Sequence, residues 1–322
     1  MEVGDFPLKG KIVVVTGGGS GIGFEIVKLA VSIGSKVVVA DLKLNEQAEA
    51  FVKSQDEKDL VFQRCDVTKR ADLERLVEVA EEKWGEVPDV YMASAGVFEP
   101  ATSNFWTDTE TDSYTTLAVN VTAPLKLTRI ALRAFLRSNK RGVVLLVSSI
   151  AGYAGTYAVP LYTASKHAVV GFAKSMRKAD AEEGVKVVAL CPGVVRTPLW
   201  TPGASNVSNV SEASSGGGGS GANGGQTNLL KDFAYPASVI LEPAVVAQAA
   251  VRLAERGEYG GGTVLECTTA GLRVIPEWGV KPPPHRESGD RNTGAPREVV
   301  PPEKVEVKEY LARERRGGRS KL

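Results

Sequence analysis

Short apolar runs alternate with amphipathic stretches along most of the chain. Residues 11–16 form a β-branched run that is apolar on both faces, as expected of a buried parallel strand. Residues 22–33 then place apolar side chains at helical spacing, and Gly34 ends that helix. A second apolar run covers residues 36–40. The chain therefore begins as strand, helix and strand.

The same alternation continues to residue 267. Strands are expected at 60–64, 88–93, 142–147, 185–190 and 262–267, and helices at 69–84, 112–137, 162–180 and 243–256. Strands that alternate with helices in this way are joined by right-handed crossovers. The sequence thus predicts an α/β fold, a doubly wound parallel sheet (Rossmann fold) with helices on both faces.

Two segments depart from this pattern and set the domain boundaries. Residues 1–275 are expected to form one domain, with a glycine- and serine-rich insertion at about 201–228. That composition buries too little apolar surface to offset its ordering entropy, so a flexible loop is expected there. Residues 276–322 form a proline-rich, charged extension, in which residues 302–316 are expected to form a short helix.

Composition excludes several function classes. The 322 residues are 43% hydrophobic and 24% charged, which is ordinary for a soluble globular protein. A net charge of +1 argues against a nucleic acid as the main partner. No apolar run approaches the roughly 18 residues of a membrane helix, and the N-terminus lacks the pattern of a signal peptide. The chain is therefore expected to be made in the cytosol and to bind neither nucleic acid nor membrane.

The cysteines and histidines predict neither a disulfide framework nor a metal site. Cys65, Cys191 and Cys267 are far apart and odd in number, which favours buried, reduced thiols. His167 and His285 are the only histidines, and neither belongs to a metal-ligand spacing.

A glycine-rich loop follows the first strand and precedes the first helix. Glycines at this place allow a tight turn and bring the backbone close to a pyrophosphate, while the helix N-terminus offers free N–H groups. The loop predicts a dinucleotide site rather than a structural turn. A nucleotide-triphosphatase loop is disfavoured because no Lys-Ser/Thr pair follows. The cofactor-binding residues expected here are Gly17, Ser20, Gly21, Ile22 and Gly23.

Asp41 follows the second strand, eighteen residues after Gly23. A carboxylate at this place can bond both hydroxyls of the adenosine ribose and would repel the extra phosphate of NADP. Leu42 follows it, rather than a basic residue, but Lys43 comes next. The sequence therefore favours NAD, with NADP left open.

Tyr162 and Lys166 open a predicted helix and lie four residues apart, so they share one helix face. A tyrosine has a pKa of about 10, which a neighbouring ammonium and an oxidised nicotinamide would both lower. Ser149 ends the fifth strand, where its hydroxyl could hold a substrate oxygen. The pattern predicts proton transfer by Tyr162. Without the other motifs, however, Tyr162 and Lys166 would be read as an ordinary pair on a helix surface, and Ser149 as a polar residue at the end of a strand. Its neighbour Ser148 could also be mistaken for it.

Several motifs in the right order make the chain resemble a short-chain dehydrogenase/reductase of the typical single-domain kind, over roughly residues 8–200 and 243–270. The stretch from Tyr162 to Phe172 also resembles the hydroxyprostaglandin-dehydrogenase-like branch. The matching motifs are Thr16-Gly17-x-x-x-Gly21-x-Gly23, Asp66-Val67, Ala95-Gly96, Asn120, Ser149, Tyr162-x-x-x-Lys166 and Pro192-Gly193-x-x-x-Thr197.

The resemblance implies a role for each matching position. Tyr162 would be the general acid/base, Lys166 would bond the nicotinamide ribose and lower the pKa of the tyrosine, and Ser149 would orient the substrate. Asn120 would hold a water that links Lys166 to solvent. Further contacts to the cofactor are implied for Asp66 and Val67 at the adenine, for Ala95 and Gly96, and for Pro192, Gly193, Val195 and Thr197 at the nicotinamide.

The resemblance has one departure, and it also implies an assembly. Ser94 stands where the family usually has asparagine, which puts that asparagine's structural hydrogen bonds in doubt. Family members usually pair through the helices expected here at 112–137 and 162–180. A homodimer or homotetramer is therefore expected.

The chain ends in Ser320-Lys321-Leu322. A terminal Ser-Lys-Leu is an address read by the peroxisomal import receptor, and the basic stretch from Arg313 to Arg319 would present it. The alternative is a charged, disordered tail. A peroxisomal location is expected, or a cytoplasmic one if the signal is not used.

These patterns together predict an NAD(H)-dependent oxidoreductase. It would interconvert a secondary alcohol, its small-molecule substrate, and the corresponding ketone, with Tyr162 as general acid/base. Two alternatives remain: an NAD(P)H-dependent ketone reductase of secondary metabolism, and a non-catalytic NAD-binding protein. Intact Ser149, Tyr162 and Lys166 argue against the last.

Overall fold

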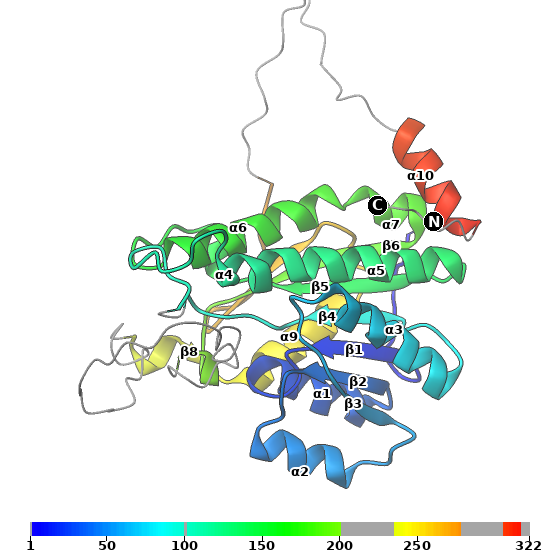
Figure 1. Ribbon diagram of the computed structural model, residues 1–322, viewed down its shortest axis with the longest axis horizontal. Helices are drawn as coiled ribbons and strands as arrows, with labels where there is room; N and C mark the ends of the chain where they lie inside the picture. The colour runs from blue at the N-terminus through cyan, green and yellow to red at the C-terminus, as the bar shows by residue number, and fades with distance from the viewer. Residues whose placement is uncertain (1, 100–101, 201–234, 278–304, 317–322) are drawn as a thin grey trace, which may run out of the picture.

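A mostly parallel sheet forms the centre of the fold (Figure 1). The computed structural model describes residues 2–99, 102–200, 235–277 and 305–316. Within them, eight strands pair in the order β10-β9-β6-β5-β4-β1-β2-β3, and all are parallel except β10, which is antiparallel to β9. The strands are β1 (Ile12–Thr16), β2 (Lys36–Asp41), β3 (Leu60–Arg64), β4 (Val90–Ala93), β5 (Gly142–Val147), β6 (Val185–Pro192), β9 (Val264–Thr268) and β10 (Gly271–Val274). A separate pair joins β7 (Val194–Val195) to β8 (Ile240–Leu241).

Helices cover both faces of this sheet, which confirms the predicted Rossmann fold. Figure 1 shows α5 and α6 along one face and α1 along the other. The helices are α1 (Gly21–Ile33), α2 (Glu46–Ser54), α3 (Arg70–Trp84), α4 (Thr115–Leu117), α5 (Ala123–Arg137), α6 (Pro160–Ser175), α7 (Lys178–Glu183), α9 (Pro243–Glu255) and α10 (Val305–Arg315). Single 3₁₀ turns lie at η2 (Ile150–Gly152), η3 (Pro198–Trp200) and η4 (Ala237–Val239).

The apolar strands are buried because both of their faces meet helices. In β1, Ile12 and Val14 point into the core beneath α3 and α5, whereas Val13 and Val15 point into the core beneath α1 and α9. All four side chains are at most 3% exposed. A continuous apolar run is therefore what a central parallel strand requires.

The structure divides the predicted helix at 112–137 differently. The helix begins at Thr115, and residues Ala118–Thr122 form a π-helical turn (η1) before α5. Pro124 has no N–H to donate to the carbonyl of Asn120, so the α-helical ladder is interrupted there. Asn120 thus lies in an irregular turn rather than in a regular helix.

Other boundaries also differ from the prediction. The helix expected at 162–180 is two helices, α6 and α7, and it starts two residues earlier because Pro160 suits a first helical turn. The sequence analysis missed α2 and the edge strand β10. The helix expected at 302–316 is found as α10. The insertion at 201–228, nearly all of the proline-rich stretch at 276–301 and the terminal Ser-Lys-Leu lie outside the described residues.

The C-terminal helix α10 packs against α5 of the same chain (Figure 1). Glu314 is 6% exposed and forms ion pairs with Arg129 at 2.5 Å and Arg133 at 3.5 Å. The Arg129 guanidinium also lies 5.7 Å from the centre of the Tyr310 ring. α5, one of the helices expected to pair subunits, therefore contacts α10, and Arg313 belongs to this helix rather than to a tail.

The described residues include three free cysteines, and all are buried, as predicted. Among the same residues, no group of His, Cys, Asp and Glu is arranged to hold a metal ion. None of the described helices combines the length and apolarity that crossing a membrane requires.

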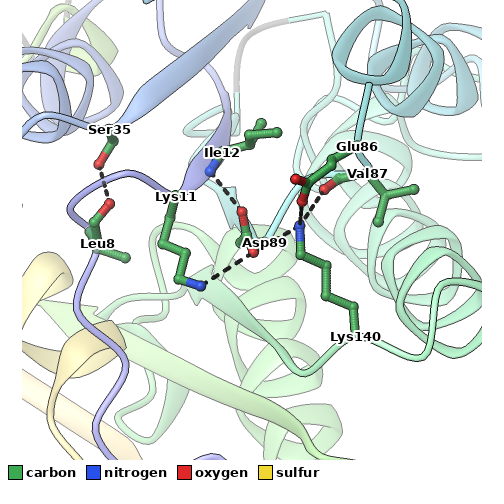
Figure 2. A network of polar contacts seen from close by, with 8 residues as sticks. All are labelled: Leu8, Lys11, Ile12, Ser35, Glu86, Val87, Asp89 and Lys140. Carbon is green, nitrogen blue, oxygen red and sulfur yellow. Dashed lines mark hydrogen bonds and ion pairs between the residues drawn. The ribbon is translucent and has the colours of Figure 1, made fainter. Parts of the chain in front are cut away.

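A buried carboxylate ties the amino ends of β1 and β4 together (Figure 2). Asp89 is 4% exposed and accepts a hydrogen bond of 2.8 Å from the backbone N–H of Ile12. Its other oxygen lies 2.9 Å from Lys140 Nζ and 3.7 Å from Lys11 Nζ. Burial alone would lower the pKa of Lys140, but its hydrogen bonds to Glu86 and Asp89 raise it. Lys140 is therefore held as a cation beside Asp89.

Replacing Asp89 with alanine should lower the free energy of unfolding by about 3 kcal/mol, because the buried N–H of Ile12 and the half-buried ammonium lose their partner. Urea denaturation followed by circular dichroism would measure this. Glu86→Ala is the matched control, since Glu86 also bonds Lys140 but is 68% exposed, and it should cost less than about 1 kcal/mol. Equal losses for the two variants would contradict the assignment.

Candidate active site

A cleft of about 720 Å³ opens at the carboxyl ends of the parallel strands. It lies where the strand order reverses, because β1 is followed by β2 on one side and flanked by β4 on the other. All the predicted site residues except Asn120 line this cleft: Gly17, Ser20, Gly21, Ile22, Gly23, Asp41, Asp66, Val67, Ala95, Gly96, Ser149, Tyr162, Lys166, Pro192, Gly193, Val195 and Thr197.

The glycine loop is packed too closely to accept side chains. A Cβ added to Gly23 would lie 2.1 Å from the carbonyl oxygen of Gly17, and one added to Gly17 would lie 2.7 Å from the backbone N of Ala95. Gly17 also has a φ of +69°, which side chains disfavour. α1 starts at Gly21, so its first N–H groups point out of the helix beside the loop. This bare cradle at a helix N-terminus fits the pyrophosphate of a dinucleotide.

Asp41 lies beside this loop at the end of β2. Its Oδ2 accepts a 2.9 Å hydrogen bond from the backbone N–H of Gly19. Its Oδ1 accepts a longer one, of 3.4 Å, from Lys43 N–H. The carboxylate is thus held at the rim of the cleft, at the place expected for an adenosine ribose.

The departure at Ser94 leaves the junction between β1 and β4 intact. The backbone N–H of Ser94 donates to the carbonyl of Thr16 at 3.2 Å, and that of Ala95 donates to the Thr16 hydroxyl at 3.5 Å. Thr16, the first residue of the glycine motif, therefore holds Ala95 and Gly96 against the loop.

Tyr162 and Ser149 meet at the far end of the cleft. Burial raises the pKa of Tyr162 to about 12, and a hydrogen bond with the Ser149 hydroxyl opposes this rise only in part. The lowering expected from the sequence is thus wrong for the protein alone. The reason is burial of the phenol, which Lys166 does not offset: its Nζ lies 5.4 Å from the centre of the Tyr162 ring and donates to the carbonyl of Val147 at 3.0 Å.

Lys166 lies between the tyrosine and Asn120. Burial lowers the pKa of Lys166 to about 8. The Asn120 amide bonds both backbone groups of Val97 at 2.9 Å and donates to Ser165 Oγ at 3.1 Å. A Cβ on Gly96 would meet Asn120 Oδ1 at 3.4 Å and Lys166 Nζ at 3.8 Å. The structure thus brings Asn120 behind Lys166, and its part in a water relay stays a prediction.

The two neighbouring serines have separate contacts. The Ser148 hydroxyl donates to the carbonyl of Lys166 at 2.9 Å and is 3% exposed. The Ser149 hydroxyl faces Tyr162 and accepts from the backbone N–H of Ala151 at 3.2 Å. Ser148 therefore ties β5 to α6, while Ser149 faces the cleft.

The family model for the short chain dehydrogenases matches residues 11–207, which is most of the part that builds this cleft. The chain belongs to the short-chain dehydrogenase/reductase family.

Curated relatives support this assignment. Short-chain dehydrogenase reductase 3a of Arabidopsis thaliana is 36% identical over 191 residues, which is 59% of this chain and 73% of that protein. L-fucose dehydrogenase of Bos taurus is 32% identical over 263 residues, 80% of this chain and 88% of that protein. Momilactone A synthase of Oryza sativa subsp. japonica is 34% identical over 192 residues, 60% of this chain and 69% of that protein. Such relatives make the protein a dehydrogenase or reductase that uses NAD or NADP. The narrower resemblance to the hydroxyprostaglandin-dehydrogenase-like branch stays a prediction.

Glu99 is a site residue of this short-chain dehydrogenase that the sequence analysis missed. Its carboxylate is buried, at 6% exposed, and accepts from the backbone N–H of Tyr162 at 3.0 Å and of Phe105 at 3.1 Å. Glu99 adopts a φ of +36°, in the left-handed region that a non-glycine residue rarely occupies. A negative charge at the N-terminus of α6 is favourable, so Glu99 stabilises the turn that carries Tyr162.

Aromatic side chains near Tyr162 were missed as well. The Phe98 ring packs edge-on against that of Tyr162, with ring centres 4.7 Å apart, and lies tilted against that of Trp200, with ring centres 4.6 Å apart. The Trp200 ring lies 6.1 Å from that of Tyr235. Tyr162, Phe98, Trp200 and Tyr235 are called the aromatic row below. An aromatic residue in a loop gives no periodic signal, so the sequence alone did not mark Phe98, Trp200 or Tyr235.

Proposed function

We propose that this protein interconverts a secondary alcohol and its ketone with NAD(H), and that Tyr162 transfers the proton. The observation that carries the proposal is the place of the Tyr162 hydroxyl. It is buried and bonded to Ser149, with the Lys166 ammonium 5.4 Å from the centre of the Tyr162 ring, at the end of a cleft whose other end is the glycine cradle.

In oxidation of the alcohol, the nicotinamide, Ser149 and Tyr162 each have a separate role. When bound, an oxidised nicotinamide supplies the acceptor for the hydride of the carbinol carbon and a positive charge that favours the Tyr162 phenolate. The Ser149 hydroxyl donates a hydrogen bond to the substrate oxygen and orients it. The Tyr162 phenolate takes the proton of the alcohol hydroxyl as the C–O double bond forms. Reduction of the ketone runs through the same positions in reverse, with Tyr162 donating the proton.

Replacing Tyr162 with phenylalanine should lower kcat for alcohol oxidation by about 1,000-fold, because the proton loses its acceptor. The affinity for NADH, measured by fluorescence titration, should not change. The matched control is Tyr157→Phe, since Tyr157 is 85% exposed and its substitution should change neither kcat nor the affinity for NADH.

The pH profile adds a second readout. Because burial raises the pKa of Tyr162, the phenolate fraction grows as pH rises toward that value. The rate of oxidation by the wild type should therefore rise with pH above neutrality, whereas that of ketone reduction, which uses the protonated tyrosine, should stay level until the pH approaches that value. Undiminished turnover by the phenylalanine variant would refute catalysis by Tyr162. NADH binding without turnover of any alcohol or ketone by the wild type would favour the non-catalytic alternative.

Asp41 supports NAD as the preferred cofactor. Its carboxylate is held at the cleft rim by Gly19, where a phosphate on the ribose would meet a like charge. The backbone around it is also close, since a Cβ on Gly19 would lie 2.3 Å from the carbonyl of Lys43. Lys43 itself is the group that would favour NADP.

Asp41→Ala should raise the ratio of NADP⁺ to NAD⁺ efficiency by about tenfold or more, because the like-charge repulsion is removed. Initial rates with NAD⁺, NADP⁺, NADH and NADPH would measure this ratio and also reveal the favoured direction. Faster turnover by the wild type with NADPH than with any other cofactor would instead support the ketone reductase of secondary metabolism.

The last three residues support a peroxisomal location through the import receptor. Ser320-Lys321-Leu322 end the chain six residues after Arg316, the last residue described beyond α10. A fluorescent protein fused to the N-terminus should give a punctate, peroxisomal signal that disappears when these three residues are deleted. The same diffuse signal from both fusions would refute the proposal.

A further inference from the structure

The cleft separates charge from apolar surface along its length. Among its described lining residues, the carboxyl ends of β2 and β3 and the segments after them supply the charged side chains Asp41, Lys43, Arg64, Asp66 and Lys69. The lining residues that follow β4, β5 and β6 carry one charged side chain, Lys166, whose ammonium is bonded to Val147 O. The sheet order places these two groups on opposite sides of β1. The substrate end is therefore nearly uncharged.

The substrate end is also lined by rings. The aromatic row leads away from the Tyr162 hydroxyl through Phe98 and Trp200 to Tyr235. The polar edge of Trp200 is already satisfied, because its Nε1 donates to the carbonyl of Val195 at 2.7 Å. The indole is thus fixed in place, and what it offers a ligand is apolar ring surface.

Aliphatic side chains complete the same end. Ile150, Ala151, Ala154, Val159, Val194 and Leu199 line the cleft beside the aromatic row. The described polar side chains there are nearly all hydroxyls: those of Ser149 and Tyr162 take the reacting oxygen, Ser148 is bonded to Lys166 O, and the others belong to Ser94, Thr115, Thr156, Thr197 and Tyr235. In the described part of this end, a single hydroxyl on the ligand therefore finds partners, whereas no carboxylate or amide is present to hold an array of hydroxyls.

We infer that the substrate is an uncharged secondary alcohol whose carbinol carbon adjoins an aromatic or fused ring, or the corresponding ketone. The inference rests on the proposed function and adds the substrate class. Ring faces prefer edge-to-face or offset contact with other rings, which Phe98 and Trp200 supply in fixed orientations. A polyol, in contrast, would lose its hydrogen bonds to water without recovering them here.

The inferred class does not include L-fucose, for which the bovine relative is named. A sugar presents several hydroxyls, and a site that rejects or accepts them does so through buried hydrogen-bonding groups. Neither an amide nor a carboxylate lines the described part of this substrate end. The similarity to L-fucose dehydrogenase is therefore not a reason to propose a sugar as the substrate of this protein.

Steady-state oxidation by the purified full-length chain at saturating NAD⁺ tests the class with three probes: 1-tetralol, 2-butanol and L-fucose. We expect kcat/KM for 1-tetralol to exceed that for either other probe by at least tenfold. Trp200→Leu should lower the ratio of the 1-tetralol value to the 2-butanol value by about tenfold, because only the larger substrate reaches the ring. Trp106→Leu is the control, since Trp106 is half-exposed and lies outside the cleft lining.

Binding without turnover separates the two proposals. Calorimetric titration of 1-tetralone into the NADH complex of Tyr162→Phe should show binding, and Trp200→Leu in that background should weaken it about tenfold. Binding of 1-tetralone with no oxidation of any probe by the wild type would refute the proposed activity and leave the substrate class standing. Faster oxidation of L-fucose than of 1-tetralol would refute the class and leave the activity. Absence of 1-tetralone binding would likewise overturn the class.

Discussion

Every part of the site depends on the hydrogen bonds that β1 makes with two partners at once. β1 pairs with β2 along one edge and with β4 along the other, so the chain must leave the sheet in opposite directions after them. The connections that follow the carboxyl ends of β1 and β4 consequently diverge and leave a cleft between them. Thr16 keeps this opening narrow by bonding Ala95 across it, and Asp89 holds the opposite ends of the same two strands together.

Burial then determines the chemistry of the deepest groups. Tyr162 and Lys166 lie on one turn of α6, yet the same burial moves their pKa values in opposite directions, because it disfavours the charge of each. Their ordinary pKa values lie close together, whereas in the folded chain burial separates them, to about 12 for Tyr162 and about 8 for Lys166. Burial thus keeps Tyr162 neutral in the protein alone.

The fold and most of the site residues could be predicted from the sequence because both depend on local patterns. Apolar runs predict buried strands. The glycines predict a loop and the Tyr162-x-x-x-Lys166 spacing predicts a shared helix face, and each of these signals needs only a few neighbouring residues. The places where prediction failed depend on distant contacts. Glu99 acts on a residue 63 positions away, and the π-helical turn at Asn120 follows from Pro124 within an otherwise helical pattern. The raised pKa of Tyr162 required knowing that the phenol is buried and that Lys166 bonds Val147.

The segregation of charge along the cleft has a consequence for how such enzymes diversify. The groups that face the adenosine half come from β2 and β3, while the rings that face the substrate come from segments after β4 and β6, and the rigid β1 separates them. No described side chain belongs to both sets, so a substitution in one set removes no lining side chain from the other. Cofactor preference and substrate choice can therefore drift independently in evolution, as two separately heritable traits of a single small domain.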